Sequence, residues 1–142
     1  VVMGKRFLDL AIRKCREHTF DSAMEFTLCA ILVKSGRVLS IGFNRSGYSA
    51  MMTKHKHHNG VCSVHAEVDA LLQARMCDVT DATIYVARIR KKGDLGLAKP
   101  CPMCQSILHE QGIKTAFFTL IGSDNAFGTL DLRIPPTFKR MG

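Results

Sequence analysis

Two short motifs, each standing directly before an apolar pattern of helical period, most constrain how this chain can fold. The first is His-Ala-Glu at residues 65–67, and the second is Pro-Cys-Pro-Met-Cys at residues 100–104. A proline fits the first turn of a helix, where its missing N–H costs nothing. Cys101 and Cys104 would then present both sulfurs on one side of that turn. The sequence therefore predicts two helices that begin at reactive side chains.

Taken together, the two motifs favour a metal site. A helix N-terminus stabilises thiolates, and two thiolates with the imidazole of His65 are three ligands suited to zinc. His65 and Glu67 would point roughly 200° apart in mid-helix, so they converge only at a helix mouth. We expect Glu67 to face a metal-bound water, take its proton and later deliver it to a leaving nitrogen. For Cys101 and Cys104 alone, a redox pair or buried thiols stay equally open.

The apolar pattern along the rest of the chain predicts an α/β sandwich with mixed strand directions. Helices are expected over about residues 4–18, 64–76 and 102–111, the last one closed by Gly112. Strands are expected over residues 27–33, 38–43, 82–89, 113–120 and 129–134. The intervening residues 44–61, 93–100 and 121–128 are expected to form loops or turns.

Composition indicates one ordinary globular domain over residues 1–142. The chain is 46% hydrophobic and 23% charged, which excludes a disordered chain, a collagen-like fibre and a coiled coil. Its longest uncharged apolar run, residues 26–33, is shorter than the ~20 residues of a membrane span, and the N-terminus lacks a signal-peptide pattern. We therefore expect a cytoplasmic protein with no membrane partner, whose six cysteines bind metal or stay reduced.

The charge distribution favours an anionic partner. Lys and Arg number 20 against 12 Asp and Glu, which gives a net charge of +8 and a pI near 9.4. Residues 26–66 contain no acidic side chain, and a second basic run covers residues 88–99. A charge run alone is more often a solvated loop, but both runs lie directly before the two motifs. The partner could be nucleic acid or a phosphorylated small molecule.

His65-Ala66-Glu67 with Pro100-Cys101-x-x-Cys104 resembles the signature of the zinc-dependent cytidine/deoxycytidylate deaminase superfamily. The resemblance covers about residues 5–120. It implies a cytidine-deaminase-like three-layer sandwich with a central, mixed five-stranded sheet, and hydrolytic deamination as the reaction. It further implies that His65, Cys101 and Cys104 bind Zn²⁺ and that Glu67 is the catalytic proton shuttle.

The resemblance extends to two substrate-binding elements. Residues 41–45, Ile-Gly-Phe-Asn-Arg, are similar to the family's strand-end G-x-N segment, which implies that Asn44 hydrogen-bonds the sugar or base. The alternative is that Asn44 caps a turn. The backbone N–H groups of Ala66 and Cys101 lie at helix starts and could hold the base carbonyl oxygen.

Other polar and apolar clusters receive simpler interpretations. A second zinc site is one interpretation of a histidine-rich stretch, although a solvated loop facing phosphate is favoured. Its members are His55, His57, His58 and Cys62. Cys15, Cys29 and Cys77 are expected to be core residues, as are Phe117 and Phe118.

Three function classes remain open at this point. The favoured one is deamination of a free cytosine nucleoside or nucleotide, with a phosphate held by one or two of Arg45, Lys54, Lys56 or Lys99. The second is an editing deaminase of tRNA or single-stranded DNA, and the third is a non-catalytic zinc module.

Residues 120–129 are too short for the helix that polynucleotide-editing relatives insert, so an antiparallel C-terminal hairpin is expected. We also expect a homo-oligomer. Asp69 departs from the asparagine of many deoxycytidylate-type enzymes.

Overall fold

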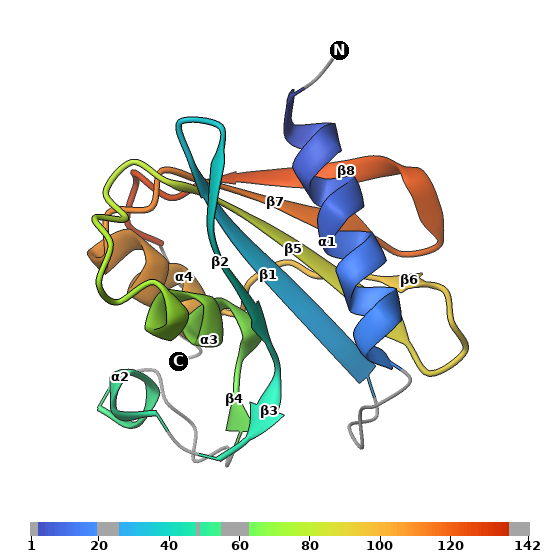
Figure 1. Cartoon of the computed structure of the whole chain (residues 1–142), viewed down its shortest axis with the longest axis horizontal. Helices are drawn as coiled ribbons and strands as arrows, with labels where there is room; N and C mark the ends of the chain where they lie inside the picture. Colours follow the sequence, from blue (N-terminus) through green and yellow to red (C-terminus); the bar gives the residue numbers. More distant parts are fainter. Residues whose placement is uncertain (1–2, 20–25, 48, 55–62, 137–142) are drawn as a thin grey trace, which may run out of the picture.

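The computed structural model describes residues 3–19, 26–47, 49–54 and 63–136 (Figure 1). Four helices lie in these ranges: α1 (Met3–Thr19), α2 (Ala50–Thr53), α3 (Ala66–Gln73) and α4 (Pro102–Glu110). The strands are β1 (Phe26–Lys34), β2 (Arg37–Phe43), β3 (Arg45–Ser46), β4 (Ser63–Val64), β5 (Thr83–Arg90), β6 (Leu95–Gly96), β7 (Thr115–Leu120) and β8 (Ser123–Asp131).

The central sheet is mixed. Its strands are ordered β2-β1-β5-β7-β8, and β6 pairs with the second half of β5. The β5–β7 pair is parallel, whereas β1–β2, β1–β5 and β7–β8 are antiparallel. A parallel pair requires a crossover connection, and the segment containing α4 supplies it. The predicted α/β fold, its mixed sheet and its antiparallel C-terminal hairpin are confirmed.

Helices cover both faces of the sheet (Figure 1). On β1, Cys29 and Ile31 face the core beneath α1, whereas Ala30 and Leu32 face the core beneath α3 and α4. The alternation follows from the two-residue period of a strand that is buried on both sides. Among the described residues, no helix is long and apolar enough to cross a membrane.

Several predicted boundaries are wrong. Strand β8 begins at Ser123, six positions before the predicted strand, because pairing with β7 overrides the turn preference of Ser-Asp-Asn. Helix α3 ends at Gln73, so Met76, expected on its apolar stripe, is 91% exposed. The predicted loop over residues 93–100 contains β6, which pairs with β5. The predicted loop over residues 44–61 contains β3 and α2.

The three cysteines expected in the core divide into two groups. Cys15 and Cys29 are buried between α1 and the sheet, and the Cys15 thiol donates a hydrogen bond to the Thr27 carbonyl at 3.0 Å. Burial raises the pKa of Cys15 to about 12, so this thiol stays protonated. Cys77 is exposed because α3 ends before it, which corrects the sequence prediction. Phe118 is buried as expected, and Phe117 packs at the edge of the α1 core.

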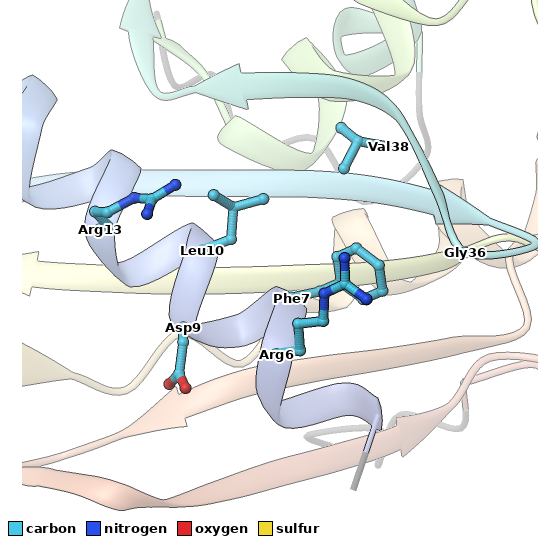
Figure 2. A pocket seen from close by; sticks show the side chains of 7 residues that line it. All are labelled: Arg6, Phe7, Asp9, Leu10, Arg13, Gly36 and Val38. Carbon is cyan, nitrogen blue, oxygen red and sulfur yellow. The ribbon is translucent and has the colours of Figure 1, made fainter. Parts of the chain in front are cut away.

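A hollow of about 580 Å³ lies between α1 and the β1–β2 hairpin (Figure 2). Arg6, Leu10 and Arg13 line it from α1, and Val38 lines it from β2. This hollow is on the α1 face of the sheet, whereas the predicted metal ligands are on α3 and α4 at the other face. The hollow is therefore separate from the predicted active site.

The first turns of α3 lie directly against β2 at Gly42. A Cβ atom built on Gly42 would overlap the backbone nitrogen of Ala70 and lie 2.5 Å from the Ala66 carbonyl oxygen. The Ser40 hydroxyl, two positions earlier on β2, donates to the Ala70 carbonyl at 2.7 Å. The absence of a side chain at Gly42 therefore allows the α3 backbone to approach the sheet.

We expect Gly42→Ala to lower the free energy of unfolding by about 3 kcal/mol or more, because the new methyl group meets the rigid backbone of α3 at Ala66 and Ala70. Gly36→Ala is the control: its site in the β1–β2 turn is open, so only backbone strain at φ +75° is added, about 1 kcal/mol. Urea denaturation of both variants measures the difference. Equal losses would contradict the close approach.

Candidate active site

The predicted ligands come from the starts of two helices. His65 is the N-cap residue of α3, and Cys101 is the N-cap residue of α4, with Pro102 at the first helical position. Both N-cap residues have extended backbone, and neither side chain bonds its own helix as a cap. Their donor atoms are therefore free to point beyond the helix ends, which is the condition that the sequence analysis required.

The structure brings His65, Cys101 and Cys104 together. Their ligand atoms lie within 4.8 Å of one another. His65 Nδ1 is 3.2 Å from Cys104 Sγ and 3.6 Å from Cys101 Sγ. Nitrogen and sulfur ligands of a tetrahedral zinc, at about 2.0 and 2.3 Å from the metal, are separated by about 3.5 Å. The donor set and its spacing therefore fit zinc.

Mutual hydrogen bonding shifts the pKa values of the three side chains. The hydrogen bond from Cys104, together with that from His65, lowers the pKa of Cys101 to about 4 against the opposing effect of burial. Cys104 donates a hydrogen bond to Cys101 and is buried, and both effects raise the pKa of Cys104 well above its usual value. The hydrogen bond to Cys101 also raises the pKa of His65. The lowered pKa of Cys101 favours the thiolate form, which is the form that binds a metal.

Glu67 is buried beside the cluster in the first turn of α3. Its side chain is only 5% exposed, and burial raises its pKa to about 7, while the charge of His65 lowers it. The carboxyl group also hydrogen-bonds Cys104. A buried carboxyl next to a potential metal site, but not one of its three clustered ligands, can accept and return a proton.

Asp69 joins α3 to the end of β2, a role that sequence reasoning missed. Its side chain is buried, and Oδ2 accepts the Phe43 N–H at 3.0 Å. Oδ1 accepts from Arg45 Nε, also at 3.0 Å. The only sequence signal was the placement of Asp69 two residues after Glu67. Its partners lie 24 and 26 residues away and could not be read from the local pattern.

Asn44 lies at the end of β2, and its amide bonds the neighbouring strand. Its Oδ1 accepts the Leu28 N–H at 2.8 Å, and its Nδ2 donates to the Phe26 carbonyl at 3.1 Å. Through these two bonds, the Asn44 side chain continues the contact between β2 and β1 beyond the last residue of β2. An amide offers two N–H donors and two lone pairs, so one donor and one lone pair remain beyond these bonds.

The candidate phosphate ligands have different surroundings. Arg45 is paired with Asp69, as described above. Lys54 is the exposed C-cap residue of α2, and Lys99 is exposed directly before the Pro-Cys motif. The candidates Lys56, His55, His57, His58 and Cys62 lie outside the described residues.

Nucleobase deaminases that use zinc hold it with a His-Cys-Cys set beside a glutamate. The α/β sandwich and the side chains at its two helix starts therefore define a protein of the deaminase class. A family model described as "Cytidine and deoxycytidylate deaminase zinc-binding region" matches residues 3–120, and the chain belongs to this family. The family predicted from the two motifs is thus confirmed. Comparison with the curated proteins finds no match.

Solved structures with the same fold have low sequence identity. Cytidine deaminase from Burkholderia pseudomallei has a TM-score of 0.57 and 21% identity, over 89% of this chain and 91% of that one. The dCMP deaminase from the cyanophage S-TIM5 in apo form has a TM-score of 0.56 and 19% identity, over 84% and 87%. The same phage enzyme in complex with dCMP and dUMP has a TM-score of 0.53 and 18% identity, over 80% of each chain. These similarities show a shared fold.

Asp69 provides a prediction that separates its two contacts. Asp69→Asn keeps an acceptor for the Phe43 N–H but loses the ion pair with half-exposed Arg45, so we expect a loss of about 1 kcal/mol in unfolding free energy. Asp69→Ala also leaves the Phe43 N–H without an acceptor, and about 2–3 kcal/mol is expected. Urea denaturation measures both. Arg45→Gln, the control, should match Asp69→Asn, and equal losses in the two Asp69 variants would refute the assignment.

Proposed function

We propose that this protein hydrolytically deaminates a cytosine nucleoside or nucleotide to the uracil product and releases ammonia. The observation that carries the proposal is the burial of Glu67 beside the cluster of His65, Cys101 and Cys104. Zinc does not need a fourth protein ligand at a catalytic site. Burying a carboxyl group that does not bind the metal costs folding free energy, and a catalytic role would explain why the chain keeps one there.

Zinc is the proposed cofactor, held by His65 Nδ1 and by the sulfurs of Cys101 and Cys104. When bound, zinc lowers the pKa of water and so supplies a nucleophile at neutral pH. The Glu67 carboxylate removes a proton from the attacking water and donates it to the amino nitrogen that leaves as ammonia. The base carbon gains the water oxygen as its bond to the amino nitrogen breaks.

Substrate binding is proposed for the residues that surround the helix starts. The backbone N–H groups of Ala66 and Cys101 would hold the base carbonyl oxygen, because helix N-termini favour developing negative charge. Asn44 uses one N–H and one lone pair of its amide in bonds to β1. Its second N–H and second lone pair would contact the sugar or base.

A free nucleoside or nucleotide is favoured over a polynucleotide. The antiparallel β7–β8 hairpin occupies the position at which polynucleotide-editing relatives insert a helix. The cyanophage enzyme of the same fold is described in complex with the small nucleotides dCMP and dUMP. An editing deaminase of tRNA or single-stranded DNA is the alternative, since a net charge of +8 suits a phosphate backbone.

Ammonia release distinguishes these substrates. The zinc-loaded protein is assayed with cytidine, deoxycytidine and their monophosphates, with adenosine and guanine, and with cytosine-containing single-stranded DNA and tRNA. We expect turnover of a free cytosine compound. Faster, steeply salt-sensitive turnover of a polynucleotide would favour the editing function, because many phosphate contacts make binding salt-dependent. No turnover of any cytosine compound would refute the proposal.

Removal of the sulfur ligands should remove the metal. We expect one zinc per chain in the wild type and most of it lost in a Cys101→Ala/Cys104→Ala double variant, with lower thermal stability because the metal joins two helix starts. Elemental analysis after gel filtration measures the metal content. Cys77→Ala, at an exposed position, is the control and should retain full zinc. Full zinc in the double variant would contradict the ligand assignment.

Glu67→Gln tests the proton shuttle. The amide has nearly the same shape but cannot accept the proton, so kcat should fall on the order of 100-fold or more. Zinc content and melting temperature should stay close to those of the wild type. Glu17→Gln, on the exposed side of α1, removes the same charge without effect on kcat. A Glu67→Gln variant with more than roughly a tenth of the wild-type rate would exclude Glu67 as the shuttle.

A further inference from the structure

Arg88, near the end of β5, lies on the catalytic face of the sheet. Side chains alternate along a strand, and Ile84 and Val86 pack in the core beneath α3 and α4, so Arg88 follows them on that face. Its cross-strand partner on β1 is Leu28, which packs against the same core. Leu28 also bonds Asn44 through both backbone groups. Arg88 is therefore level with the end of β2, where the substrate is proposed to bind.

The guanidinium of Arg88 contacts the Phe26 ring, but no carboxylate among the described residues neutralises its charge. Its central carbon lies 4.4 Å from the centroid of the Phe26 ring, an attractive cation–π contact. Within the described part of the chain, Arg88 Nε is buried without an acceptor, and no carboxylate forms an ion pair with this side chain. By contrast, Arg45, Arg90 and Arg133 each pair with an aspartate.

Neighbouring backbone fixes the stem of Arg88. Gly96 on β6 lies opposite it, and a Cβ at Gly96 would be only 3.0 Å from Arg88 Cδ, so the glycine makes room for this side chain. The Thr119 hydroxyl accepts the Arg88 backbone N–H and donates to the Gly96 carbonyl. From Gly96 the chain continues directly to Cys101. Arg88 is thus held between Phe26 and the segment that leads into the metal-ligand cluster.

We propose that Arg88 binds the phosphate of a nucleoside monophosphate substrate and so makes this enzyme prefer nucleotides to nucleosides. The inference rests on the proposed deaminase function. It places the phosphate at Arg88, which the sequence analysis did not consider for this role. Arg88 is half-buried, so the phosphate would bind its terminal Nη groups, and the charge of these groups has no carboxylate partner among the described residues.

Phosphate suits this group better than a neutral ligand does. Arginine has five N–H donors, no acceptor and a permanent charge, and its planar fork matches two oxygens of a phosphate. The contact with the Phe26 ring holds the guanidinium in place before a ligand binds. Charge-assisted, bidentate bonds of this kind are strong. The side chain is prepositioned, so little conformational entropy is lost on binding.

The test compares deoxycytidine 5′-monophosphate with deoxycytidine as substrates of the zinc-loaded protein. Arg88→Gln should raise KM for the monophosphate about tenfold or more, while KM for the nucleoside and both kcat values change less than about twofold. Arg133→Gln, which removes an equal charge at an exposed residue paired with Asp131, is the control and should change neither KM. Equal shifts for the two substrates, or no shift, would overturn the proposal.

A binding measurement separates this inference from the deaminase function. Titration calorimetry uses dUMP and deoxyuridine, which need no turnover. We expect tighter binding of dUMP in the wild type and loss of that preference in Arg88→Gln. If the wild type deaminates neither cytosine substrate, the proposed function fails, but calorimetry still decides the role of Arg88. Equal affinity of the wild type for both compounds would overturn that role.

A second variant covers the case in which Arg88→Gln does not fold. Arg88→Lys keeps the charge and the apolar stem but lacks the planar fork. Its selectivity for the monophosphate should fall about threefold or more, with the nucleoside kcat intact as evidence of folding. Unchanged selectivity in Arg88→Lys would then count against Arg88.

Discussion

The contact between α3 and β2 at Gly42 is the constraint on which the site depends. Helix backbone meets strand backbone there without an intervening side chain. Asp69 also accepts the Phe43 N–H at the end of β2, so the first turn of α3 is fixed to the central sheet at Gly42 and at Phe43. Since His65 directly precedes that turn and Glu67 belongs to it, their positions follow from backbone packing more than from their own contacts. Rigid support of this kind is what a preorganised site requires.

At the starts of α3 and α4, the chain has metal-binding residue types in place of side chains that would stabilise the helix as caps. N-cap positions ordinarily hold Ser, Thr, Asp or Asn, whose side chains satisfy backbone N–H groups and contribute about 1 kcal/mol each. Here they hold His65 and Cys101, and neither caps its helix. The same choice provides donor atoms beyond the helix ends in a field that favours thiolates. Packing of α3 and α4 onto the sheet offsets the missing caps.

Local patterns predicted the parts of the structure that depend on local physics. Helix periodicity and the two motifs indicated that His65, Cys101 and Cys104 would meet, because each lies at or in the first turn of its helix. The same reasoning failed at Ser123, where pairing with β7 overrides turn propensity. It could not find the role of Arg88, because the contact of Arg88 with Phe26, 62 positions earlier in the chain, depends on the pairing of β1 with β5.

Strand β6 determines which part of the connection before Cys101 can vary. The Arg88 and Ile89 positions pair with Gly96 and Leu95, and Ala98 bonds the Thr119 carbonyl, so the chain is fixed before it reaches the cluster. The exposed tip of the turn, residues 91–93, lies on the other side of this anchor. Insertions or changes of charged residues in that tip would therefore not displace Cys101. The tip can therefore acquire new surface properties while the positions of Cys101 and Cys104 stay unchanged.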